Sequence, residues 1–90
     1  MKKHFAIRVH GVVQGVFFRY AAKKQAETLG VQGFVRNEPD GSLYLEAEGE
    51  AESLKEFSAW CRRGPREAKV ERIEVTSQPM TNQFKTFSVL

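Results

Sequence analysis

Residues 11–19 of this chain read GVVQGVFFR, and this stretch decides how the rest of the sequence is interpreted. Its two glycines let successive backbone N–H groups turn toward one point. The N-terminus of a following helix would add unpaired N–H groups and the positive end of its dipole, and Arg19 would add a planar pair of donors. The stretch therefore predicts an anion-binding loop, with a plain tight turn between a strand and a helix as the alternative.

The residues on either side of this loop predict a strand and then a helix. Phe5, Ile7 and Val9 alternate with small or polar residues, as in a half-buried strand. From Phe18 to Leu29 the apolar residues recur at helical spacing, and Gly30 follows where glycine commonly ends a helix. The loop is thus expected to connect the first strand to the first helix.

The rest of the chain completes a recognisable order of elements. Its predicted parts are a strand over 31–38, a turn at Pro39-Asp40-Gly41, a strand over 42–48, a helix that ends at Gly64-Pro65, and strands over 70–76 and 84–89. We expect the last strand at an edge of the sheet. This order predicts an α+β, ferredoxin-like βαββαβ sandwich, with two helices packed on one face of a mostly antiparallel sheet.

Length and composition bound the kind of protein. The 90 residues leave room for one core, so residues 1–90 are expected to form a single domain. No apolar run approaches the roughly 18–20 residues that cross a membrane, and none after His4 is long enough for a signal peptide. We expect a cytoplasmic monomer without a membrane partner. The net charge of +3 suits an anionic ligand but is too small to demand nucleic acid.

Two motifs and the layout of the whole chain resemble the acylphosphatase family. Residues 11–19 are similar to its first signature, G-x-V-Q-G-V-x-F-R, and residues 33–37, GFVRN, to its second. Further agreement lies at Asp40-Gly41-Ser42, Glu48-Gly49-Glu50, Gly64-Pro65 with Ala68 and Val70, and Phe87. The resemblance covers essentially the whole chain. It implies the ferredoxin-like fold and the hydrolysis of small acyl phosphates to carboxylate and inorganic phosphate.

The resemblance also implies which residues do the work. Arg19 and Asn37 would be catalytic, Arg19 by binding phosphate and Asn37 by orienting water with an amide that both donates and accepts. For Asn37 the nearby turn is a plainer alternative. The rest of the phosphate site would be the backbone N–H groups of Gly15, Val16, Phe17, Phe18 and Arg19.

Two positions beside these residues depart from the family or vary within it. The variable site of the first signature is often glycine, and here it is Phe17, which bears on the flexibility of the loop or adds an apolar wall near the acyl group. Arg36 occupies a variable position beside Asn37, and we expect it only to raise the local positive potential.

Residues that other chemistries need are missing from their positions. A cysteine-dependent phosphatase would carry its thiolate six residues before Arg19, where this chain has Val13, and Cys61 is expected in the core. No G-K-[ST] run of an NTPase loop is present. His4 and His10 lack the spacing of zinc ligands and are expected at the surface. We expect no metal and no cofactor.

Acidic residues on the predicted third strand have a simple interpretation. Glu46, Glu48 and Glu50 alternate along the chain, which predicts a solvated acidic face with at best weak affinity for a hard cation. These charges also argue against an RNA-binding module of the same architecture, because such modules carry several aromatic residues on this strand and this one has only Tyr44. A binding domain without turnover is a second alternative, against which the presence of both Arg19 and Asn37 argues.

The predicted site offers no general acid, and the chemistry of acyl phosphates explains why none is needed. These substrates expel a carboxylate whose conjugate acid has a pKa of about 4, so the group leaves unprotonated at neutral pH. A cradle, an arginine and an oriented water therefore suffice for metal-free attack on phosphorus. Inorganic phosphate or sulfate is expected to compete for the same cradle.

Overall fold

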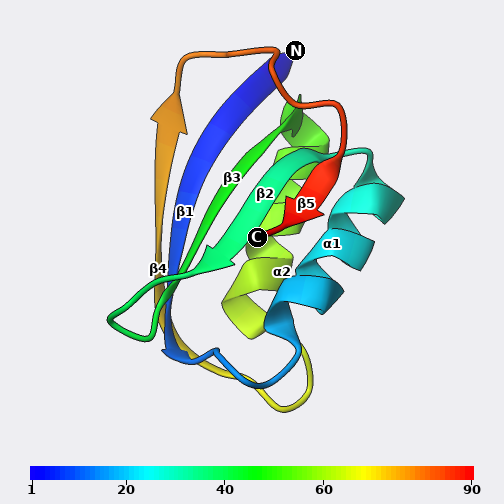
Figure 1. The fold of residues 1–90 in the computed structure, drawn as a ribbon. Coiled ribbons are helices and arrows are strands. Elements are labelled where there is room, and N and C mark those ends of the chain that lie inside the picture. The colour runs from blue at the N-terminus through cyan, green and yellow to red at the C-terminus, as the bar shows by residue number, and fades with distance from the viewer.

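The computed structural model describes all residues, 1–90, as a single sheet with two helices on one face. Its elements are β1 (Lys2–Val12), α1 (Phe18–Leu29), β2 (Gln32–Asn37), β3 (Leu43–Glu50), α2 (Ala51–Arg63), β4 (Lys69–Gln78) and β5 (Phe87–Val89). The strand order is β4-β1-β3-β2-β5, and only the β2–β5 pair is parallel (Figure 1). The predicted ferredoxin-like fold is confirmed, with β5 at an edge. No helix is long and apolar enough to cross a membrane.

Alternation along the strands directs one set of side chains toward the helices. Ile7 and Val9 of β1 pair with Leu45 and Leu43 of β3, and all four are fully buried. Burial of each such side chain stabilises the fold by about 1.5–3 kcal/mol. The core also holds Val13, Phe18, Ala22, Ala26, Val31, Val35, Ala47, Leu54, Phe57, Trp60, Cys61 and Phe87. The prediction that Cys61 lies in the core is confirmed.

β1 and β5 differ in length from the sequence prediction. β1 begins at Lys2 because its polar start pairs with the end of β3, as in the pair Lys2 and Glu50. β5 is shorter than the predicted 84–89 and begins at Phe87. Phe84 instead packs its ring near those of His4 and Phe34, with centroids 5.8 and 5.9 Å away.

The pairing of β1 with β4 shifts just before the loop that follows β1. The shift falls between His10 and Gly11, where the strand bulges. Gly11 has φ 133°, and a Cβ there would overlap the carbonyl oxygen of Lys69. Only glycine fits this approach, which lets β1 end at Val12 and the chain turn toward α1.

Candidate active site

The start of α1 is open to an incoming anion. The helix begins at Phe18, and Phe17, its N-cap residue, makes no side-chain hydrogen bond to the free N–H groups. None of the backbone N–H groups from Gly15 to Arg19 has a hydrogen-bond acceptor in the protein. Gly15 and Phe17 have φ of 75° and 62°, left-handed values that curl the backbone as in anion-binding nests. We call residues 15–19 the cradle loop.

The cradle loop is anchored from beneath by buried side chains. Phe18 is 1% exposed and meets Trp60 edge-on, with ring centroids 5.3 Å apart. Val16 packs on the core, and a side chain on Gly64 would collide with the Phe18 ring. The loop therefore presents its N–H groups from a fixed base, which favours electrostatic preorganisation.

Arg19 is oriented by the end of the chain beyond β5. Its Nη1 donates to the backbone oxygen of Leu90 at 2.8 Å, and the Leu90 N–H donates to the carbonyl of Val35 at 2.9 Å. This pair of bonds ties Arg19 to β2, two residues before Asn37. One edge of the guanidinium is thereby fixed, and its other N–H groups remain available for oxygen atoms of a ligand.

Asn37 is the last residue of β2 and is exposed. By strand alternation it lies on the same face as Val35, which is the face covered by the helices. Its side-chain amide makes no hydrogen bond within the chain, so both its donor and its acceptor are free. Arg19 is thus linked through Leu90 to the strand that ends at Asn37, and the Asn37 side chain makes no hydrogen bond to the turn that follows it.

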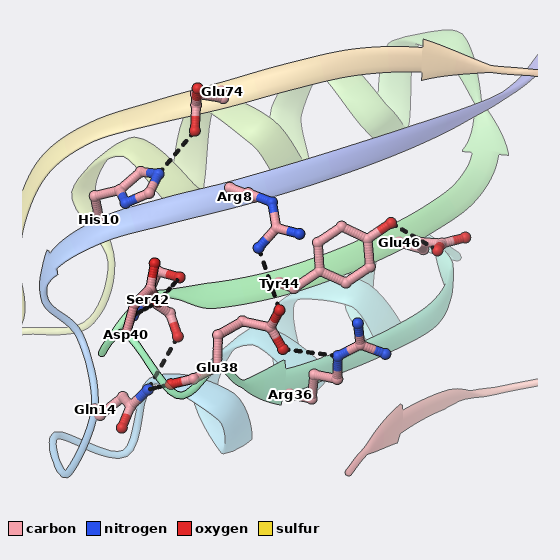
Figure 2. A network of polar contacts seen from close by, with 10 residues as sticks. All are labelled: Arg8, His10, Gln14, Arg36, Glu38, Asp40, Ser42, Tyr44, Glu46 and Glu74. Atoms are coloured by element: carbon pink, nitrogen blue, oxygen red, sulfur yellow. Dashed lines mark hydrogen bonds and ion pairs between the residues drawn. The ribbon is translucent and has the colours of Figure 1, made fainter.

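Gln14 joins the cradle loop to the β2–β3 hairpin. Its Nε2 donates to the carbonyl oxygens of Glu38 and Ser42 at 2.8 and 3.0 Å, as Figure 2 shows. Asp40 closes the hairpin by accepting from the Ser42 N–H at 2.9 Å. Gln14 lies within the first sequence motif, but only these long-range contacts show that it joins the segment before the cradle loop to the hairpin after Asn37.

The carboxylate next to Asn37 is neutralised on the open face of the sheet. Glu38 accepts from Arg36 at 2.9 Å and from Arg8 at 3.2 Å, and both guanidinium groups lie over the Tyr44 ring (Figure 2). The hydrogen bond from Arg36, and then that from Arg8, keep the pKa of Glu38 below its usual value despite some desolvation. Two guanidinium groups share this one carboxylate, so the charge of Arg36 is only partly offset, and the positive potential expected beside Asn37 stays a prediction.

Two polar residues predicted at the surface are buried at the opposite end of β1. His4 and Glu48 are 2% and 3% exposed. His4 Nδ1 lies 2.6 Å from Glu48 and its Nε2 lies 2.8 Å from Glu46. Glu48 also accepts from the Thr81 N–H and hydroxyl and from the Asn82 N–H. We call these five residues the Glu48 cluster; the surface prediction was wrong because residues 79–84 cover this part of the sheet.

The charge of Glu48 is favoured by these bonds. Burial alone would raise the pKa of Glu48, but hydrogen bonds from His4 and Thr81 outweigh it and lower the pKa to about 2. Burial likewise raises the pKa of the Cys61 thiol, with no compensating bond. No three His, Cys, Asp or Glu side chains are arranged to hold a metal ion. His10, as predicted, stays near the surface, paired with exposed Glu74 at 2.8 Å.

Comparison with known proteins places this geometry in a family. A family model described as Acylphosphatase matches residues 5–89. An acylphosphatase of Methylococcus capsulatus is 47% identical over 98% of this chain and 96% of that protein. The crystal structure of acylphosphatase from Bacillus subtilis superposes with a TM-score of 0.94 at 33% identity, covering 100% of this chain and 99% of the other. A full-length HypF structure contains a similar region, with a TM-score of 0.86 and 25% identity over 12% of its chain.

Proposed function

The chain belongs to the acylphosphatase family and hydrolyses acyl phosphates, and we propose that its cradle loop binds the phosphoryl group while Asn37 orients the attacking water. The observation that carries this proposal is the run of five backbone N–H groups, Gly15 to Arg19, without an acceptor in the protein. A helix that begins without a capping side chain leaves such donors for a ligand. The fold gains no stability from leaving these N–H groups without partners, so we expect them to bind an anion.

The proposed mechanism divides the reaction between charge stabilisation and positioning. The cradle N–H groups and the free edge of the Arg19 guanidinium bind the phosphoryl oxygens, whose charge they stabilise as the bonds to phosphorus change. Asn37 holds a water by donating to it or accepting from it, on the side opposite the leaving group. Gln14 supports this arrangement because it joins the loop to the hairpin that carries Asn37.

The bond changes need no general acid and no metal in this proposal. The oxygen of water bonds to phosphorus, and the bond from phosphorus to the acyl oxygen breaks with its electron pair on that oxygen. The leaving carboxylate departs unprotonated, and the protons of the water pass to the product phosphate and to solvent. Inorganic phosphate, which resembles the bound phosphoryl group, competes for the same cradle.

A paired measurement on Asn37→Ala tests the water-orienting role. We expect kcat to fall by roughly two decades or more, because the water is no longer positioned. Inhibition by inorganic phosphate should stay within about threefold of wild type, because the cradle and Arg19 remain. Gln83→Ala, which removes an exposed amide from the segment before β5, is the matched control and should leave both values unchanged.

Two outcomes would overturn parts of the proposal. If phosphate affinity collapses together with kcat in folded Asn37→Ala, Asn37 belongs to the cradle or its scaffold and does not act on water. Assays with excess chelator, and on Cys61→Ala, test the chemistry itself. Loss of most activity with chelator in a protein that stays folded would contradict the metal-free mechanism.

A further inference from the structure

The cradle loop borders a surface hollow of about 300 Å³ that is lined by Gly15, Phe17, Arg19 and Tyr20. Gly15, Phe17 and Arg19 belong to the proposed phosphate site through their backbone N–H groups, and Arg19 also through its guanidinium. Phe17, the N-cap residue, and Tyr20, in the first turn of α1, line the same hollow with aromatic side chains. A phosphoryl group in the cradle would therefore have an apolar surface within the length of an acyl substituent.

The exposure of these two rings has no explanation in the packing of the fold. Phe17 is 75% exposed and Tyr20 is 64% exposed, and no other aromatic side chain of the chain is exposed to this degree. Neither ring belongs to the core or packs against it. The adjacent Phe18, by contrast, is 1% exposed and packs in the core, as expected of an aromatic residue that stabilises the fold.

The backbone of Phe17 sharpens this contrast. Its φ of 62° and ψ of 20° are left-handed, a conformation that costs free energy for any residue with a Cβ and little for glycine. A bulky ring at such a position is uncommon. Strain that no packing offsets is typical of functional positions.

We propose that Phe17 and Tyr20 form the acyl-binding wall, the surface on which their two rings hold the acyl group of the bound substrate. The proposal rests on the proposed function, because the wall has this role only if the phosphoryl group occupies the cradle. An aromatic acyl group would cover both rings and remove apolar surface from water, whereas an acetyl group is too small to reach both.

The test compares benzoyl phosphate with acetyl phosphate, since both expel carboxylates of similar basicity. Wild-type protein should hydrolyse benzoyl phosphate with the higher kcat/KM. In Phe17→Gly and in Tyr20→Ala the ratio of the two kcat/KM values should fall by roughly tenfold, chiefly through KM for benzoyl phosphate. Val75→Ala, which trims an exposed apolar residue of β4, should leave the ratio unchanged.

A second readout separates the wall from a structural role. Phe17→Gly should raise the melting temperature by roughly 4–8 °C while it lowers the benzoyl preference, because glycine relieves the left-handed strain. If the ratio of the two kcat/KM values stays at the wild-type value in both variants, the acyl-binding wall is wrong. This holds also when activity on both substrates falls in parallel. Arg19→Gln tests the proposed function separately. If hydrolysis survives in that variant, the proposed role of the cradle loop and Arg19 is wrong, whatever the ratio shows.

Discussion

Beyond Val12, at one end of β1, five consecutive N–H groups lack partners, whereas around His4, at the other end, every polar atom of the Glu48 cluster that is buried has one. At the first end a phenylalanine is held at positive φ and its ring faces solvent. At the second, Glu48 accepts hydrogen bonds from the segment that leads to β5 and is itself bonded to His4, whose other ring nitrogen contacts Glu46. Both ends are polar and both are joined by the same strand.

The difference shows that hydrogen-bond partners distinguish polar groups that stabilise the fold from polar groups that are free to bind a ligand. At the Glu48 cluster the polar groups hydrogen-bond to one another, so they stabilise the fold and offer few free donors or acceptors to a ligand. At the cradle loop the donors stay unsatisfied, which costs stability and preorganises the site for an anion. Variants at the cradle loop should therefore lower activity with little effect on stability. Variants at the Glu48 cluster should lower stability with little effect on activity.

The largest expected effect is on activity, at Arg19. Arg19→Gln should lower kcat/KM by about three decades or more, because donors aimed at developing charge are removed. Arg19→Lys should rescue poorly, since a point charge cannot replace the planar fork. Unfolding in denaturant should show a change below about 1 kcal/mol, because Arg19 makes one exposed hydrogen bond, to Leu90. Near-wild-type activity in Arg19→Lys would show that the fork geometry is unnecessary.

The next effect is on stability, at His4. His4→Ala should lower the free energy of unfolding by about 2 kcal/mol, because it leaves buried Glu48 without one of its hydrogen-bond partners. His10→Ala is the matched control: its partner Glu74 is exposed, and its cost should stay below about 1 kcal/mol. Measured well below the melting temperature, kcat of His4→Ala should remain close to wild type. A loss of activity without a loss of stability would break the division between the two ends.

The smallest effect is the acid dependence contributed by Glu48. A pKa of about 2 in the folded state means that its stabilisation is complete above about pH 4.5 and is lost as the pH falls toward 2. Over that range Glu48→Gln should flatten the dependence of unfolding free energy on pH by at most about 1.4 kcal/mol per pH unit. Equal slopes in wild type and variant would show that Glu48 is not the group that titrates.

Sequence patterns predicted the elements whose signals are local. The helix Phe18–Leu29 follows from its apolar spacing and from Gly30, which caps it as predicted. The β2–β3 turn follows from Pro39-Asp40-Gly41, and the cradle loop from its glycines. Alternation also placed Glu48 on the face of the sheet opposite Leu43, Leu45 and Ala47, and His4 of β1 pairs with it there. Their burial could not be predicted, because it depends on a segment more than thirty residues away that folds over that face.

The motifs predict Arg19 and Asn37 as site residues, and that assignment stays a prediction. The contacts that support these residues have no local signal, because those of Arg19 with Leu90 and of Gln14 with the hairpin join residues 71 and up to 28 positions apart. The left-handed backbone of Phe17 has no signal in its residue type, because phenylalanine disfavours it. Ion pairing of Arg36 with Glu38 likewise appears only once both side chains are in place.

The most direct test of the comparison between the two ends is a titration with inorganic phosphate followed by ¹H–¹⁵N NMR. If the cradle loop binds the anion, the backbone amides of Gly15 to Arg19 show the largest changes in chemical shift, and they saturate with one dissociation constant. The amides of Thr81 and Asn82, already bonded to Glu48, stay in place. If the cradle amides do not move, or if the largest changes fall at the Glu48 cluster, the assignment of the phosphate site to residues 15–19 is wrong.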